Sequence, residues 1–199
     1  MQIDELLARN RAWAGRLAAE DPDAFARLAH GQRPFALYLG CSDSRVPPEA
    51  IFDVPPGSLF VHRNVANQAD ARDLNFLSVL EFGLTALEIG QILLCGHEGC
   101  GGLQRALGEP EGRIADYWLH PVRELVRTHA DELPAEPNRR LSRLAEINVL
   151  AQMHRLAGLP LVRDVRRARP LVVHGLVYDV ATGLLRRVAV DDGSGPRPG

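Results

Sequence analysis

The amino-acid sequence predicts an α/β fold: a mainly parallel four-stranded sheet with an antiparallel edge strand, helices on both faces and an N-terminal helical arm. Three observations predict this fold. Short, continuously apolar runs recur along the chain, as is typical of strands buried on both faces of a parallel sheet. Segments with apolar residues at helical spacing separate these runs. The last two apolar runs are close enough in sequence to form a hairpin.

The chain begins with a region of helical periodicity. Apolar residues over 2–30 recur at three- and four-residue intervals. Asp21-Pro22 is expected to divide this stretch into two helices, because proline has no amide hydrogen to donate. We expect residues 1–30 to form the N-terminal helical arm of one domain that spans 1–199.

Five apolar runs are predicted to be strands. Four of them should be parallel neighbours, namely 34–40, 58–62, 91–97 and 170–180. The fifth, 184–190, should pair antiparallel with the fourth around a turn at 181–183. Helices are predicted over 75–90, from near residue 100, and over 139–157. The arginine-rich segment 163–169 should be a solvated face, and 191–199 a flexible tail.

The composition is that of an ordinary globular protein. Of the 199 residues 46% are hydrophobic and 24% charged, and the formal net charge is −2. This near balance predicts no binding to nucleic acid or to an acidic membrane surface. No apolar run approaches the roughly 18–20 residues of a membrane span, and charged residues are spread through the N-terminal region. We therefore expect a cytoplasmic protein without a secretory signal.

Polar motifs follow three of the predicted strands at their carboxyl ends. These motifs are CSDSR (41–45), HRNVAN (62–67) and GHEGCGG (96–102). Because ligands of parallel α/β sheets bind at the carboxyl ends of the strands, we expect the three motifs to meet at one site.

Cys41, His97 and Cys100 are candidate metal ligands within these motifs. Two thiolates and an imidazole suit zinc, and three protein ligands leave one coordination position open for chemistry. The alternative is a buried thiol beside a core histidine. Asp43 and Arg45 follow Cys41 closely, and an arginine can hold such a carboxylate ionised beside a metal. The alternative for this pair is a salt bridge that caps a loop.

The motifs CSDSRVPPE (41–49), HRNVAN (62–67) and GHEGCGG (96–102) together resemble the β-class carbonic anhydrases. The resemblance continues through WLHPV (118–122), EINVLAQ (146–152) and VHGLVYDVATGLL (173–185), and it covers about residues 5–190. It implies a lyase, a carbonic anhydrase (carbonate dehydratase), that reversibly hydrates carbon dioxide to bicarbonate and a proton. It further implies one zinc ion per chain on Cys41, His97 and Cys100, with Asp43 and Arg45 as the catalytic dyad. Asp43 would be a fourth ligand in a closed state.

The resemblance also implies a substrate pocket, a regulatory site and an oligomer. The substrate-binding positions would be Gln32, Phe60, Val65, Phe82, Gly101 and Gly102. Gln32 would reach the substrate across the interface of a homodimer or homotetramer. Many relatives have tyrosine where this chain has Phe82. One subset of the family binds regulatory bicarbonate in a pocket that corresponds here to Tyr38, Arg63 and Tyr178, with tryptophan usual in place of Tyr38.

Three other functions stay open at this point. The chain would be a zinc-binding structural or regulatory subunit if activity had been lost, although all five ligand and dyad residues are present. A zinc hydrolase of another small substrate, such as carbon disulfide, would use the same scaffold. A thiol redox protein would use Cys41 and Cys100, although the chain has no C-x-x-C pair, and its activity would survive metal removal.

Overall fold

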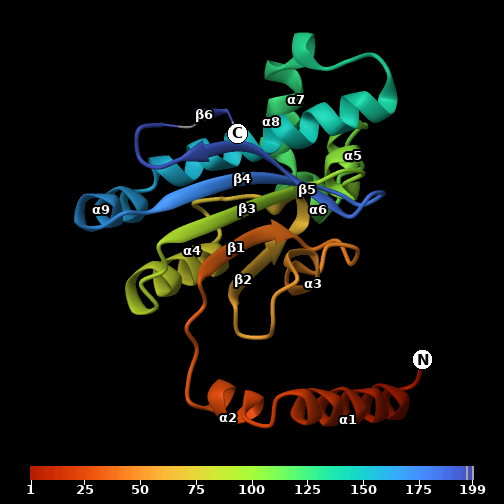
Figure 1. Cartoon of the computed structure of the whole chain (residues 1–199). Helices are drawn as coiled ribbons and strands as arrows, with labels where there is room; N and C mark the ends of the chain where they lie inside the picture. Colours follow the sequence, from red (N-terminus) through yellow and green to blue (C-terminus); the bar gives the residue numbers. More distant parts are fainter. Residues whose placement is uncertain (196, 199) are drawn as a thin grey trace. The chain divides into compact units, whose positions relative to one another are not determined.

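The computed structural model describes residues 1–195 and 197–198. The chain divides into two compact units, Met1–Arg33 and Pro34–Gly199. The first unit contains α1 (Ile3–Glu20) and α2 (Ala24–Ala29), separated where Asp21-Pro22 was predicted to break the helix (Figure 1). The Trp13 and Phe25 rings meet edge to face between these helices, with centroids 5.8 Å apart. The unit begins as the predicted arm does and continues three residues beyond residue 30.

One sheet forms the centre of the second unit, with the strand order β2-β1-β3-β4-β5-β6. The strands are β1 (Ala36–Cys41), β2 (Leu59–Asn64), β3 (Gln91–His97), β4 (Val172–Asp179), β5 (Leu184–Asp191) and β6 (Arg197–Pro198). The first four are parallel neighbours, and β5 pairs antiparallel with β4. The predicted sheet is therefore confirmed. The two-residue strand β6 extends it in the described part of the chain.

Helices connect the parallel strands. They are α3 (Pro48–Phe52), α4 (Leu74–Glu81), α5 (Gly101–Leu107), α6 (Ile114–Trp118), α7 (His120–Thr128), α8 (Pro137–Gly158) and α9 (Pro160–Ala168), with short helical turns η1 (Val65–Asn67) and η3 (Ala130–Glu132). The helix predicted over 75–90 is two elements, because α4 ends at Glu81 and a π-helix, η2 (Phe82–Ala86), follows it. None of the described helices is long and apolar enough to cross a membrane.

The two faces of the sheet are packed by different helices. Leu37 of β1 lies in one cluster with Phe76 of α4 and Met153 of α8. Tyr38, the next residue of β1, points to the opposite face and meets the Phe52 ring of α3 at 6.2 Å between centroids. Every residue of β1 is buried, and this explains why its sequence is apolar without alternation.

Part of the region expected to be a tail belongs to the sheet. Asp191 ends β5, and Arg197–Pro198 form β6. The Asp191 carboxylate is fully buried and accepts a hydrogen bond of 3.0 Å from Arg166 of α9. The arginine-rich segment 163–169 is therefore more than the solvated face that was expected, since Arg166 fastens α9 to the sheet. Residues 196 and 199 of the predicted tail lie outside the described residues.

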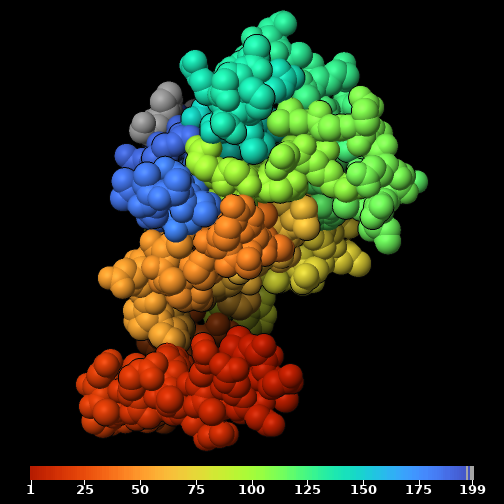
Figure 2. Space-filling view, turned by 90° about the vertical axis from the view of Figure 1, so that its right-hand side faces the viewer, coloured from red at the N-terminus to blue at the C-terminus, as the bar shows by residue number. Residues whose placement is uncertain are grey.

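The order of the strands reverses at β1, and this reversal positions the candidate site. The chain leaves β1 to form β2 on one side and returns to form β3 on the other. Connections that diverge in this way leave a crevice at the carboxyl ends of the two central strands. Cys41 ends β1 and His97 ends β3. Figure 2 shows the surfaces of the segments after these two strands, orange and yellow-green, next to each other.

Gly175 allows α8 to pack closely on β4. A Cβ atom at this position would lie 2.4 Å from the Met153 sulfur and 2.9 Å from Val149 Cγ1. We predict that Gly175→Ala lowers the free energy of unfolding by about 1–3 kcal/mol, because the core must shift to admit a methyl group. Denaturant titration measures this difference. Gly158→Ala is the matched control, since nothing lies within 4 Å of its added methyl group, and equal stability of the two variants would contradict the packing described here.

Candidate metal centre

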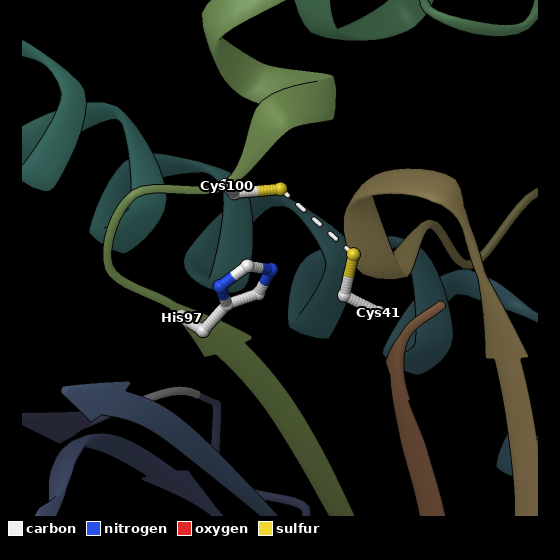
Figure 3. Close-up of side chains that lie close together, drawn as sticks. All are labelled: Cys41, His97 and Cys100. Carbon is white, nitrogen blue, oxygen red and sulfur yellow. Dashed lines mark hydrogen bonds between the residues drawn. The ribbon is translucent and has the colours of Figure 1, made fainter. Parts of the chain in front are cut away.

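Three potential metal ligands converge where β1 and β3 end. Cys41 is the last residue of β1, His97 is the last residue of β3, and Cys100 directly precedes α5. Their donor atoms all lie within 4.8 Å of one another, and the two sulfur atoms are 3.9 Å apart (Figure 3). All three side chains are buried. The structure thus brings together the three residues that the sequence singled out as ligands.

The turn between His97 and Cys100 depends on a glycine. Gly99 has φ of +63°, a left-handed conformation that glycine adopts without a steric penalty from a Cβ atom. This turn directs the Cys100 side chain back toward the strand end. Gly96, one residue before His97, has a different role, because a Cβ atom there would lie 2.8 Å from Val149 of α8.

The His97 ring presents one nitrogen to the sulfur atoms. Its Nδ1 lies 3.0 Å from the Glu98 carbonyl oxygen, to which it donates a hydrogen bond. In a neutral ring that bond leaves the Nε2 lone pair free, the arrangement typical of a histidine that ligates a metal. Nε2 is buried and has no hydrogen-bond partner among the described residues. Because a buried acceptor without a partner costs free energy, this atom and the two sulfur atoms fit a bound zinc ion.

The two thiols are electrostatically coupled. A hydrogen bond from the Cys100 thiol lowers the pKa of Cys41 and raises the pKa of Cys100. The backbone amides of Asp43 and Ala66 lower the pKa of Cys41 further. The Cys41 sulfur is therefore held as a thiolate, the form of cysteine that binds metals.

Asp43 lies beside this cluster in a pair with Arg45. The guanidinium donates to both carboxylate oxygens, at 2.9 and 2.7 Å, and these bonds hold the pKa of Asp43 well below its ordinary value. Arg45 also donates to the Gly99 carbonyl oxygen at 3.1 Å. The nearer Asp43 oxygen is 3.8 Å from His97 Nε2. The carboxylate is thus close to the donors, but its partner in this structure is Arg45.

The residues expected to bind regulatory bicarbonate belong to β1, β2 and β4, with β3 between β1 and β4. Arg63 of β2 donates to the carbonyl oxygens of Cys41, at 2.7 Å, and of Asp43, and so supports the segment that carries both residues. Tyr38 and Tyr178 belong to one cluster on the sheet face that α3 covers. Burial raises the pKa of Tyr38, and its hydroxyl has no hydrogen-bond partner among the described residues.

A strained loop after β2 packs against Cys41 and Cys100 through Ala66. Ala66 has φ of 64° and Asn67 has φ of 44°, two consecutive left-handed residues without glycine. Such a conformation persists only where its surroundings hold it. The Ala66 amide is one of the groups that stabilise the Cys41 thiolate. Gly102 permits the approach of this loop, because a Cβ atom there would lie 3.2 Å from that of Ala66.

Two buried amides of α8 hold this loop in place. The Asn148 side chain donates to the Ala66 carbonyl oxygen at 3.0 Å, and the Gln152 side-chain oxygen accepts from the Ala69 amide at 2.9 Å. Gln152 also donates to Asn148 at 2.8 Å, and both residues are fully buried. Sequence reasoning did not assign these residues to the site. The available signal was two amides, four residues apart, on the apolar face of a helix.

The predicted pocket residues Phe60 and Phe82 lie together but away from the cluster. Their rings stack with centroids 5.7 Å apart. In the sheet Phe60 pairs with Leu37, whereas Cys41 pairs with Asn64 at the far end of β2. Four residues of strand separate the two positions by about 13 Å. Within one chain, this aromatic pair therefore does not line the donor cluster.

The other predicted pocket residues are divided between the two units. Val65 follows β2 and is 43% exposed. Its side chain lies close to Gly102, because a Cβ atom added there would be 2.9 Å from Val65 Cγ1. Gly101 has open space where its Cβ would be. Gly101 and Gly102 directly follow Cys100 in the sequence, and Val65 packs against Gly102. Gln32 belongs to the first unit and is exposed.

Comparison with known proteins gives one consistent result. The sequence profile of the family described as carbonic anhydrase matches residues 36–185. A carbonic anhydrase of Emericella nidulans is 37% identical over 191 residues, which cover 94% of this chain and 84% of that protein. A tetrameric β-carbonic anhydrase of Sordaria macrospora superposes with a TM-score of 0.91 at 38% identity, covering 94% of this chain and 96% of that one. The Coccomyxa β-carbonic anhydrase in complex with acetazolamide has a TM-score of 0.92 at 36% identity, covering 100% and 89%.

Asn148 offers a test of the support that α8 gives to the metal centre. We predict that Asn148→Ala weakens zinc retention by about 10–100-fold, the usual cost of losing a group that orients metal ligands. The rate and extent of zinc transfer to a chromophoric chelator measure this effect. Asn138→Ala is the matched control, because Asn138 is exposed in the first turn of the same helix. Equal zinc retention in the two variants would show that Asn148 does not support the centre.

Proposed function

This chain belongs to the carbonic anhydrase family, in its β class, and we propose that Cys41, His97 and Cys100 hold one catalytic zinc ion. The chain is thus a lyase that interconverts carbon dioxide and bicarbonate. The observation that carries the zinc proposal is the donor cluster itself: two sulfur atoms and one imidazole nitrogen, all buried, at the strand ends where an α/β sheet binds its ligand.

The residues around the cluster indicate how the reaction is guided. A zinc ion supplies a Lewis acid that makes water a nucleophile near neutral pH. Asp43, kept ionised by Arg45, accepts a hydrogen bond from the attacking water molecule and so directs its lone pair at carbon dioxide. Arg45 also binds the Gly99 carbonyl oxygen, and this bond fastens the dyad to the turn that carries Cys100. While the Asp43–Arg45 pair is intact, this bond positions the carboxylate relative to the ligands.

We propose that Asp43 competes with water for the fourth position on the metal. Its carboxylate is near enough to the His97 nitrogen to reach a shared ion after a small shift, yet both of its oxygens are bonded to Arg45. Breaking this pair would let Asp43 ligate the zinc ion and would close the site. We propose that the intact pair corresponds to the open state of the site.

A second copy of the chain is proposed to complete the substrate pocket. Carbon dioxide is apolar, and Phe82, which is 48% exposed and stacked on Phe60, offers an apolar wall that its own metal centre does not use. The related protein of Sordaria macrospora is tetrameric. We therefore propose a homodimer or homotetramer in which Phe60, Phe82 and Gln32 serve the neighbouring site. Val65, Gly101 and Gly102 would serve the site of their own chain.

Bicarbonate regulation at Tyr38, Arg63 and Tyr178 stays a proposal. In its support, the buried Tyr38 hydroxyl is free to donate to an anion. Arg63 would have to exchange its bonds to the Cys41 and Asp43 carbonyl oxygens for the anion, and this exchange would release the segment that carries Asp43. The cytoplasmic location expected from the sequence likewise stays a prediction.

Zinc content and carbon dioxide hydration test the proposed centre together. We predict that Cys100→Ser loses both zinc and activity, because one of three ligands is replaced by a poor one. Asp43→Asn should keep the zinc but lower kcat by about 100-fold or more, since the amide has no charge and both donates and accepts hydrogen bonds. Stopped-flow hydration, with zinc measured on the same samples, gives both quantities.

Asp53→Asn is the matched control for the Asp43 variant. Asp53 is exposed and has φ of 52°, a conformation that asparagine also adopts. The Asp53→Asn variant should therefore be as active as the wild type. A zinc-loaded wild type that does not hydrate carbon dioxide would overturn the proposal. Activity that survives complete removal of zinc would favour chemistry of the thiols alone.

Mixed oligomers test whether Phe82 serves a neighbouring chain. Phe82→Ala and Cys100→Ser chains should each have little activity alone. When the two are unfolded, mixed and refolded together, a native site forms from the ligands of the first chain and the phenylalanine of the second. We predict hydration activity well above the sum of the separate samples. Activity no greater than that sum would mean that Phe82 acts within its own chain or not at all.

A further inference from the structure

A cavity of about 460 Å³ opens on the second unit outside the metal centre. It is lined by the segment after η1, the beginning of α7 and the carboxyl end of α8. Its charged lining residues are Asp70, Arg72 and Arg155, and Pro121 and Leu159 are among its apolar walls. A volume of this size is typical of sites that hold small molecules. The functions described above use none of these residues.

The charged residues that line this cavity carry a net positive charge. Two arginines and one aspartate leave one positive charge in the lining. Asp70 accepts from Arg72 through both carboxylate oxygens, at 3.0 and 2.7 Å. Arg155 forms no ion pair within the described part of the chain, and its guanidinium donates to the neutral Gln152 side chain at 3.2 Å. Asp70 attracts Arg155 only at longer range, because its oxygens are already bonded to Arg72.

The environment of Arg155 makes this unpaired charge unusual. Its side chain is half-buried, and burial lowers the pKa of its guanidinium. A guanidinium has five N–H donors and cannot lose its charge in a protein, so a buried one normally meets a carboxylate or a phosphate. The remaining donors of Arg155 are therefore available to a bound anion in the cavity.

Arg155 is also connected to the metal centre. Gln152, its hydrogen-bond partner, binds Asn148, and Asn148 binds the carbonyl oxygen of Ala66. Hydrogen bonds thus lead from the cavity to the backbone of Ala66, which packs in one cluster with Cys41.

We propose that this cavity binds a small oxyanion, a carboxylate or a phosphate, through Arg155 with Arg72 at its rim, and that binding alters the support of the loop beside Cys41. An anion that binds the Arg155 guanidinium breaks the hydrogen bond from Arg155 to the Gln152 side-chain oxygen. That oxygen then accepts a hydrogen bond from the Ala69 amide alone. Gln152 and Asn148 adjust together, because they are bonded to each other. The anion site stands without the proposed zinc centre, whereas the coupling to Cys41 rests on it.

Calorimetric titration of the zinc-loaded protein tests the anion site, with inorganic phosphate and acetate as separate probes. We expect saturable binding of at least one probe in the wild type. Arg155→Gln should weaken it by about tenfold or more, since it removes a charged hydrogen-bond donor. Arg139→Gln, an exposed arginine of the same helix, makes the same charge change outside the cavity and should bind like the wild type.

These titrations also separate the possible sources of a signal. The stronger probe identifies the anion as a phosphate or a carboxylate. Any anion bound at the metal would remain in both variants, because neither changes a metal ligand. Wild-type affinity in Arg155→Gln, or no saturable binding to the wild type, would overturn the proposal.

The absorption spectrum of the cobalt-substituted protein tests the coupling. We expect the stronger probe to shift the sulfur-to-cobalt charge-transfer band in the wild type and in Arg139→Gln but not in Arg155→Gln. A band that stays unchanged while the anion binds would overturn the coupling. So would a shift that persists in Arg155→Gln, because the anion would then lie on the metal. A protein without any sulfur-to-cobalt band would instead contradict the proposed metal ligands.

Discussion

The donor cluster exists because two strands that are distant in sequence end side by side. Cys41 closes β1 and His97 closes β3, and these strands are neighbours only because the chain forms β2 first and then returns past β1. A change in this strand order would separate the cysteine from the histidine. The Gly99 turn then adds Cys100, whose sulfur comes to 3.9 Å from that of Cys41. The chemistry of the site therefore depends first on the topology of the sheet.

Hydrogen bonds around the strand ends fix the positions of the segments that carry the ligands. Arg63 supports the segment that follows Cys41 from the neighbouring strand. Asn148 and Gln152 of α8 hold a second segment, the loop whose backbone is strained at Ala66. These groups bond to backbone atoms, so they restrain where the ligands lie without occupying the metal. Gln152 also accepts a hydrogen bond from Arg155, which lines the proposed anion cavity.

Much of the site could be predicted from the sequence, because strand ends and metal-ligand types are local signals. The run 91–97 coincides with β3, and the hairpin turn between β4 and β5 lies at 180–183, where 181–183 was predicted. Features that depend on packing between distant segments could not be predicted from these local signals. The π-helix that begins at Phe82 has the same apolar spacing as an ordinary helix, and the position of Phe60 four residues before the strand end follows from register. Arg166 looked solvated because its partner, Asp191, lies 25 residues further along the chain.

In the proposed centre, two sulfur atoms and one imidazole nitrogen of this chain bind the same zinc ion. X-ray absorption at the zinc edge of the purified protein tests this ligand set most directly, because it reports the ligand atoms themselves. We predict two sulfur ligands at about 2.3 Å and two nitrogen or oxygen ligands at about 2.0–2.1 Å. A zinc ion surrounded by four sulfur atoms, or by none, would contradict it.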